Sequence, residues 1–86
     1  MKDLILHLAK QLVDRTEEVV VTEIEGQQSS VIELRVAKED LGKIIGKKGK
    51  NIQAMRTILN AASVKTGKRC VLELIANAKR GHTSKT

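Results

Sequence analysis

The chain contains no Phe, Tyr, Trp or Pro among its 86 residues. Every large side chain of a hydrophobic core must therefore be Leu, Ile, Val or Met. The hydrophobic fraction of 41% and the charged fraction of 30% are close to those of ordinary globular proteins, so the chain can build such a core. The lack of aromatic rings excludes nucleic-acid modules that stack bases on them, such as the RNA-recognition motif. The length is that of one small domain, which excludes a multidomain enzyme.

The positive charge of the chain is concentrated in one segment. The formal net charge is +6, but residues 1–40 carry a net −4. Residues 41–72 contain eight Lys or Arg and no acidic residue, and residues 73–86 carry a net +2. An acid-free stretch of this kind concentrates positive potential and attracts an anionic partner such as a phosphate backbone. A solvated basic face without a partner is the alternative interpretation.

The first half of the sequence predicts a helix followed by a β-hairpin. Apolar residues recur with helical spacing over residues 3–13, opposite a polar face. Residues 18–25 are rich in β-branched side chains, which crowd a helix and suit a strand. Residues 32–36 alternate between apolar and charged side chains, the pattern of a half-buried strand. The polar segment 26–30 begins with glycine and is expected to turn the chain, so that the two strands pair antiparallel.

The second half predicts two helices and a third strand. Helical spacing indicates a short helix over residues 38–45 and a longer one from the segment 46–49 to Thr66 and Gly67. In the last strand, alternate residues over 70–76 can face the core. A helical crossover of about thirty residues usually joins parallel strands, with a right-handed connection. The predicted fold class is therefore α+β, helix-strand-strand-helix-helix-strand, with a three-stranded mixed sheet and helices on one face.

The segment 44–52, with the sequence IIGKKGKNI, has the features of a phosphate-binding turn. Its G-x-x-G spacing permits positive φ angles and a close approach of the backbone to a ligand, because glycine has no Cβ. The following helix directs its unpaired N–H groups and the positive end of its dipole toward the turn. The candidate phosphate-binding residues are the four residues of the turn and two flanking lysines, namely Gly46, Lys47, Lys48, Gly49, Lys43 and Lys50.

Other functions of glycine-rich loops do not fit this spacing. A Walker P-loop requires G-x-x-x-x-G-K-[ST], which neither Gly42 nor Gly46 begins, and G-x-G-x-x-G does not occur. Nucleotide hydrolysis and dinucleotide binding are therefore unsupported. A helix-turn-helix with a glycine turn and no ligand is the alternative that a bare G-x-x-G would favour. The flanking isoleucines, the two lysines inside the turn and the preceding strand favour a phosphate site instead.

At these residues the sequence resembles the KH domain, whose signature is an aliphatic residue, Ile, Gly-x-x-Gly, two further positions and Ile. The predicted order of elements resembles the type II KH topology. Residues 1–76 resemble the bacterial KhpA-type proteins, which are single KH domains, and the stretches 33–37 and 39–43 are similar to that family's sequences. The expected organisation is one KH domain over residues 1–76 and a polar, mobile C-terminal tail over residues 77–86.

The resemblance implies a groove that holds roughly four single-stranded nucleotides, with the G-x-x-G loop on the phosphate backbone. KH grooves use aliphatic floors and hydrogen bonds to base edges, which suits a chain without aromatic residues. Ile45 and Ile52 would shape the floor or brace the two helices, and core packing is an equal alternative for Ile52. Lys43, Lys50 and Arg56 are candidate electrostatic contacts, with simple solvation as the alternative for each.

The resemblance also implies a cytoplasmic RNA chaperone or post-transcriptional regulator. Proteins of this family self-associate, and they pair with a larger RNA-binding protein that carries its own KH domain, in cell-wall homeostasis and cell shape. A second apolar row on the long helix, Ala54, Ile58 and Ala61, is the candidate interface for a homodimer or for that partner. Packing of this row on the first helix is the alternative.

Two other functions are alternatives to RNA binding. One is a protein–protein adaptor that uses the KH fold mainly for dimerisation, with a lysine loop that is only electrostatically sticky. The other is a non-specific basic DNA-binding protein. The acid-rich first half and the absence of an extended basic arm argue against wrapping a duplex.

The remaining chemical groups predict no reaction. Cys70 lies in an apolar run and is interpreted as a small core residue. His7 and His82 lack partners at metal-ligand spacing, and no nucleophile, base and orienting residue can be assembled, so no metal, cofactor or catalysis is expected. No apolar stretch approaches the roughly 18 residues that span a bilayer, so no membrane partner is expected and the default compartment is the cytoplasm.

Overall fold

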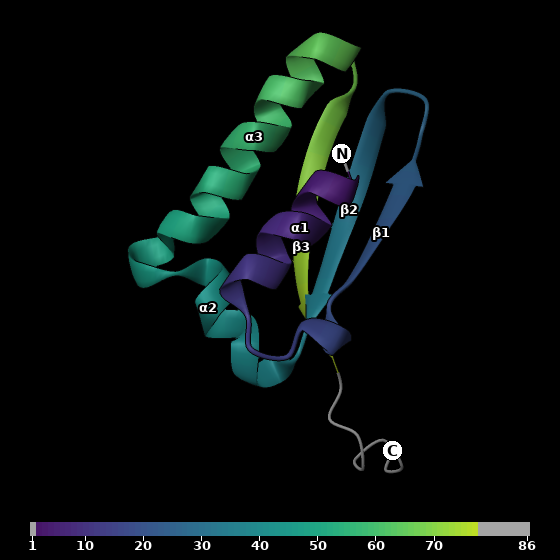
Figure 1. Ribbon diagram of the computed structural model, residues 1–86. Helices are drawn as coiled ribbons and strands as arrows, with labels where there is room; N and C mark the ends of the chain where they lie inside the picture. Colours follow the sequence, from purple (N-terminus) through teal and green to yellow (C-terminus); the bar gives the residue numbers. More distant parts are fainter. Residues whose placement is uncertain (1, 78–86) are drawn as a thin grey trace.

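The computed structural model describes residues 2–77, which form three α-helices, three strands and three short 3₁₀ turns (Figure 1). In chain order the elements are α1 (Lys2–Leu12), η1 (Thr16–Glu18), β1 (Val20–Glu25), β2 (Ser29–Val36), η2 (Lys38–Asp40), α2 (Leu41–Ile45), η3 (Lys47–Gly49), α3 (Lys50–Thr66) and β3 (Arg69–Ala76). The order of helices and strands is the one that the hydrophobic periodicity predicts.

The three strands form one mixed sheet in the order β1-β2-β3. β1 pairs with β2 antiparallel, with Ile24 opposite Val31. β2 pairs with β3 in parallel, with Leu34 opposite Leu74. The helices lie on one face of this sheet (Figure 1). The predicted α+β class, the mixed three-stranded sheet and the one-sided placement of the helices are therefore confirmed, and the arrangement is consistent with a KH-type fold.

The core lies between β2 and the helices. Ile32, Leu34 and Val36 alternate along β2 and have no exposed surface, because β2 is covered by a strand on each side and by helices on one face. The helices contribute the buried residues Ile5, Ala9, Ile44, Ile52, Met55 and Leu59. Every apolar side chain in this core is aliphatic or Met, as the composition requires, so the packing depends on the fit of branched aliphatic groups.

Two predicted elements differ from the structure at their boundaries. The strand predicted over residues 18–25 begins at Val20, because the Val19 N–H donates to the Thr16 carbonyl at 3.2 Å and closes η1 before the strand starts. The helix predicted over residues 38–45 is divided into the 3₁₀ turn η2 and the α-helix α2. Both differences come from short backbone hydrogen bonds, which hydrophobic spacing does not reveal.

The end of β3 also differs from the prediction. Ala76, expected to face the core, is exposed, because β3 is an edge strand and ends there. Asn77, assigned by its sequence to a mobile tail, is held by two hydrogen bonds. Its N–H donates to the Val36 carbonyl at 2.8 Å, and its Nδ2 donates to the Glu18 carbonyl at 3.0 Å. The rest of the predicted tail, residues 78–86, lies outside the described residues.

Asp40 is a buried charged residue, with 1% of its surface exposed, at the start of α2. Its Oδ2 accepts a hydrogen bond from the Arg15 N–H at 2.9 Å, and its Oδ1 lies 3.7 Å from Lys43 Nζ. The Arg15 N–H is the main cause that lowers the pKa of Asp40; burial opposes it, and the Lys43 charge adds to the lowering. This carboxylate connects the segment after α1 to the helix that precedes the G-x-x-G turn.

Asp40→Asn should destabilise the fold in a pH-dependent way, because it keeps an acceptor oxygen but removes the charge. The folded-state pKa of Asp40 is lowered from its ordinary value of 3.8. The ionised carboxylate therefore stabilises the fold above about pH 4, and this stabilisation is lost as the pH falls through the lowered pKa. Urea unfolding between about pH 7 and about pH 3 measures the free energy of unfolding of the wild type and of the variant. The difference between the two should narrow in acid. A difference that stays constant across this range would contradict the role of the charge.

Candidate nucleic-acid interface

The turn between α2 and α3 has a left-handed backbone. Gly46 has φ 77° and ψ 172°, Lys48 has φ 57° and ψ 26°, and Gly49 has φ 73° and ψ 17°. Among the described residues, Lys48 is the only one other than glycine with a positive φ. Both glycines of the motif therefore occupy conformations that residues with a Cβ adopt only at a cost.

The first N–H groups of α3 follow this turn directly, and the first of them, that of Lys50, donates to the Lys47 carbonyl. Lys50 has helical angles directly after the left-handed Gly49, and no side chain caps the start of α3. A reversal of handedness within a turn brings successive N–H groups together, and here they lie at the positive end of a long helix. Such a concavity binds anions, phosphate among them.

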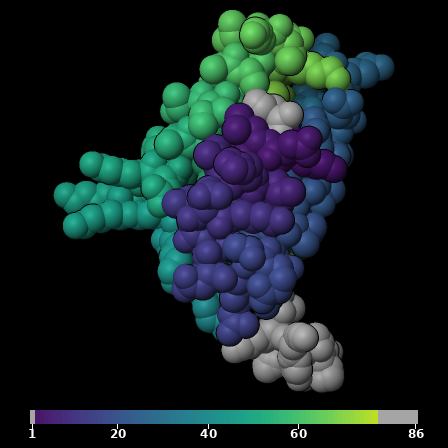
Figure 2. Space-filling model, in the orientation of Figure 1, coloured from purple at the N-terminus to yellow at the C-terminus, as the bar shows by residue number. Residues whose placement is uncertain are grey.

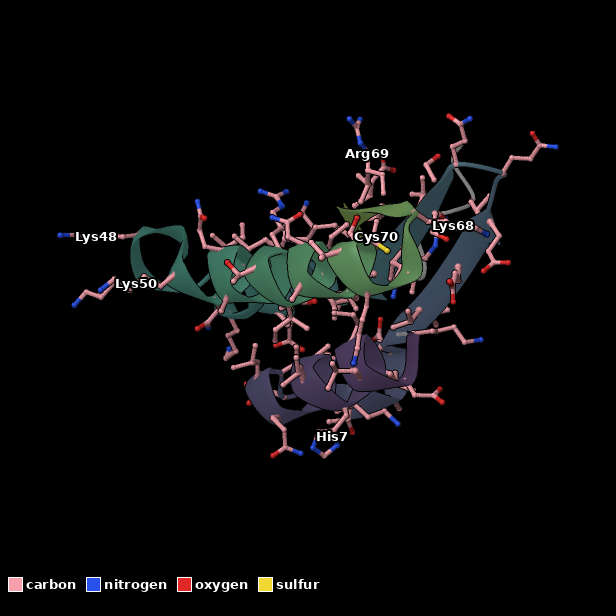
Figure 3. All side chains as sticks on the ribbon, turned by 90° about the horizontal axis from the view of Figure 1, so that it is seen from above. His7, Lys48, Lys50, Lys68, Arg69 and Cys70 are labelled. Atoms are coloured by element: carbon pink, nitrogen blue, oxygen red, sulfur yellow. The ribbon has the colours of Figure 1, made fainter. Side chains whose placement is uncertain are left out.

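Three lysine side chains surround the turn. Lys47, Lys48 and Lys50 are exposed, and none of them forms a salt bridge within the described part of the chain. Long side chains of this loop extend away from the body of the molecule (Figure 2). Lys48 and Lys50 project from the end of α3 into solvent (Figure 3). Their charges are therefore available to a polyanion.

Lys43, the fourth predicted lysine, has a different environment. Its Nζ lies 3.3 Å from Asp14 Oδ2 and 3.7 Å from Asp40 Oδ1. Two carboxylates thus pair with this half-exposed cation, and one of them is the buried Asp40. The structure places Lys43 among the contacts that hold α2 and not among the free cations of the turn.

A groove of about 370 Å³ lies between α3 and β3. It is lined by Arg56, Leu59, Asn60, Arg69, Cys70, Val71 and Leu72. Arg69 projects on the side of α3 that faces away from α1 (Figure 3). The leucines give the groove an apolar floor, while α3 and β3 each supply one guanidinium group to its walls.

The backbone of β3 also borders this groove. β3 is an edge strand, and the Arg69 N–H donates to the Gln28 carbonyl at 3.1 Å, toward β2. In a parallel strand the N–H and C=O of one residue point to the same side, and the side alternates along the chain. Cys70 and Leu72 therefore direct their N–H and C=O groups to the free edge, where the groove gains main-chain donors and acceptors.

Comparison with known proteins identifies the family. The family model "KhpA/KhpB, KH domain" matches residues 2–74. The chain belongs to this family. It is similar to the RNA-binding protein KhpA of Clostridium acetobutylicum, with 52% identity over 75 residues that cover 87% of this chain and 100% of the relative. It is also similar to the RNA-binding protein KhpA of Aquifex aeolicus, with 53% identity over 75 residues, 87% of this chain and 95% of the relative.

The isoleucines of the KH signature and Arg56 divide between surface and core in this member of the family. Ile45 is 38% exposed beside the turn. Ile52 is 8% exposed and packs in the core, so the core-packing alternative describes it. Arg56, predicted as an electrostatic contact, lines the groove between α3 and β3. The signature therefore combines residues that build the domain with residues that can meet a ligand.

Sequence reasoning missed part of this KH-domain groove. Asn60 and Arg69 line it but were not among the candidate residues, and Cys70, interpreted as a core residue, is half-buried and borders it as well. The available signal was the position of Arg69 in the acid-free segment, directly after the long helix. This position indicates a groove residue only when the sheet order is known, because the order brings β3 to the edge beside α3.

The second apolar row on α3 lines a separate groove of about 210 Å³ against α1. Ala54 and Ile58 border it, together with Leu8 and Leu12 of α1. Ala61, the third member of the predicted row, is exposed and does not line this groove. α1 therefore covers the row only in part and leaves an open apolar groove in this KhpA/KhpB-family domain.

Other chemical groups are dispersed in this domain. Within residues 2–77, no group of three or more His, Cys, Asp or Glu side chains could hold a metal ion. His7 projects from α1 on the side away from α3 (Figure 3), and His82 lies outside the described residues. None of the helices among residues 2–77 has the length and apolar character of a membrane span.

Substitutions at Lys48 test the backbone of the turn separately from its charge. Lys48→Val should destabilise the domain by about 1 kcal/mol relative to Lys48→Ala, because a β-branched side chain is strained at positive φ. Lys48→Gly should be at least as stable as Lys48→Ala, because glycine adopts this conformation freely. All three variants lose the same charge, so urea unfolding isolates the backbone effect. Equal stability of all three would show that residue 48 is not held at positive φ.

Proposed function

We propose that this member of the KhpA/KhpB family is a non-enzymatic RNA-binding protein. Single-stranded RNA would lie along the groove between α3 and β3, with its phosphates on residues 46–49 and Lys50. The observation that carries this proposal is the N-terminus of α3, which has no side-chain cap and is surrounded by three exposed lysines. From this end α3 runs along an arginine-lined groove. The name of the two relatives, RNA-binding protein KhpA, supports it.

Unpaired nucleotides fit this groove better than a duplex. The free N–H and C=O groups of Cys70 and Leu72 can hydrogen-bond to base edges only where those edges are not already paired. The floor formed by Leu59 and Leu72 offers apolar contact to a base. Such a floor suits a chain that has no aromatic ring on which a base could stack.

The positions of the acidic residues also favour the side of the molecule that carries the groove between α3 and β3. Glu23 and Glu25 lie on β1, at the opposite edge of the sheet. Glu33 and Glu73 are neighbours in the pairing of β2 with β3, on the sheet face away from the helices. Glu33 pairs with Arg35 at 3.4 Å and Glu25 with Lys68 at 4.0 Å, whereas Glu23 and Glu73 form no salt bridge among the described residues, so their repulsion of phosphate disfavours both surfaces. The acid-free segment 41–72 contains the turn and every residue that lines the groove.

The finer parts of the proposal follow from the resemblance to KhpA-type proteins. We propose an RNA chaperone or post-transcriptional regulator in the cytoplasm. It would act with a larger RNA-binding protein that has its own KH domain, in cell-wall homeostasis and cell shape. The groove between α1 and α3 is the proposed interface for this partner or for a second copy of the chain, and its apolar lining by Ala54 and Ile58 supports this. The same groove supports the second candidate function, an adaptor that uses the KH fold mainly for dimerisation.

Reversing the charge of the turn, with Lys47→Asp and Lys48→Asp together, should abolish binding of single-stranded RNA. Both side chains are exposed, so the fold should survive, and Asp tolerates the positive φ at position 48. Fluorescence anisotropy with a labelled, random-sequence RNA measures the affinity, and circular dichroism measures the fold. Unchanged affinity in a folded double variant would refute the proposed function.

Lys2→Asp with Lys10→Asp is the matched control for this experiment. It changes the net charge by the same amount, but both residues are exposed on α1, outside the turn and the groove. The control should retain RNA binding; its loss would mean that net charge alone determines affinity. For the unmodified protein, neutralisation of about three phosphates corresponds to a log-log salt slope of roughly −2.

Ile58→Asp tests whether the groove between α1 and α3 is an interface. The variant should shift the mass measured by light scattering toward the monomer, because it places an unpaired charge in an apolar contact. Val64→Asp is the matched control, since Val64 lies on the same helix, is 86% exposed and does not line the groove. An unchanged mass for Ile58→Asp would favour simple packing of α3 on α1.

A further inference from the structure

Asn51 connects the two sides of the phosphate-binding turn. It lies in the first turn of α3, and its Nδ2 donates a hydrogen bond to the Lys43 carbonyl of α2 at 2.9 Å. The last carbonyls of a helix lack partners within the helix. The Gly46 N–H donates to the Gly42 carbonyl at 2.9 Å, and Asn51 satisfies the next carbonyl along α2.

The side chain of Asn51 also packs directly against Gly46. A Cβ at position 46 would lie 2.6 Å from Asn51 Cγ and 2.7 Å from Asn51 Nδ2, closer than such atoms approach in proteins. At Gly49, by contrast, a Cβ would meet nothing within 4 Å. The two glycines of the motif therefore differ: both have a positive φ, but only Gly46 makes room for a neighbouring side chain, that of Asn51.

The turn needs a contact of this kind to keep its shape. The charges of Lys47, Lys48 and Lys50 repel one another, and Lys48 is held at a positive φ. Such a conformation persists only where the surrounding contacts over-determine it. The hydrogen bond from the Gly49 N–H to the Gly46 carbonyl, at 3.0 Å, lies within the turn, whereas the bond from Asn51 joins α3 to α2.

We propose that Asn51 is a positioning residue for RNA binding. It holds residues 46–49 in the conformation that presents the lysines and the N-terminus of α3 to phosphate. This inference rests on the proposed function. The side chain acts through the turn, because it removes an ordering cost that the ligand would otherwise meet, and preorganised sites bind more tightly for this reason. Asn51 thus supplies geometry, while the lysines supply charge.

Asn51→Ala should weaken binding of a labelled, random-sequence, single-stranded RNA about three- to tenfold, the effect of one net hydrogen bond that orders a site. The log-log salt slope should keep its wild-type value, because every cation remains in place. Removal of one phosphate-binding lysine should instead lower the affinity and flatten the slope by about 0.7. The slope therefore distinguishes positioning from direct charge contact.

Amide hydrogen exchange gives a second measurement, in the free protein. In Asn51→Ala the Gly49 N–H should exchange faster, because the turn that holds it against the Gly46 carbonyl is no longer fixed, while the amides of β2 should keep their protection. Gln53→Ala is the matched control, since it removes an exposed amide side chain from the same end of α3. The control should match the wild type in affinity and in exchange.

Asn51→Ser keeps a shorter hydrogen-bond donor and should fall between the wild type and Asn51→Ala in both measurements. It provides the test if the alanine variant does not fold. Wild-type affinity and exchange in a folded Asn51→Ala protein would overturn the positioning role and leave the proposed function intact. A weaker affinity with a flatter salt slope would also overturn it. A wild-type protein that binds no RNA would overturn the proposed function and this inference with it.

Discussion

The parallel pairing of β2 with β3 determines where a binding site can lie. Two neighbouring parallel strands need a crossover connection, and here α2, the turn and α3 supply it on one face of the sheet. α3 runs back beside β3, so that the N-terminus of α3 and the turn lie at one side of the molecule (Figure 1). β3 is the edge of the sheet, and this leaves the groove between α3 and β3 open.

The paired charges around α2 and the unpaired lysines of the turn have different roles in this fold. Carboxylates from the acid-rich first half hold α2 in place, because Asp40 accepts the Arg15 N–H and joins Asp14 in pairing with Lys43. The lysines of the turn have no such partners among the described residues. Paired charges thus secure the helix before the turn, and unpaired cations remain where phosphate would bind. The formal net charge hides this division, since it counts Lys43 and Lys48 alike.

Periodicity predicted the elements of this fold because, in an aromatic-free chain, aliphatic spacing reports burial directly, as at Ile32 on β2. The end of α3 was predictable from a different signal, Gly67, which has φ 78° there. The turn was predictable because its glycines act through the local backbone. The groove was not, because Arg69 becomes part of it only when β3 pairs with β2. In the sequence Asn51 is an ordinary helical residue, and only the structure shows its contact with Gly46.

The absence of aromatic residues sets the energetics of the proposed RNA complex. Stacking on an aromatic side chain contributes about 1–3 kcal/mol per base in single-strand-binding proteins, and this chain has no such side chain. Binding must come instead from phosphate contacts at the turn, main-chain hydrogen bonds along β3 and apolar contact with the groove floor. The phosphate term depends on salt and not on base sequence. The main-chain hydrogen bonds require a base edge to meet a fixed backbone, so discrimination between sequences depends on the rigidity of β3 and of the turn that positions the RNA strand beside it.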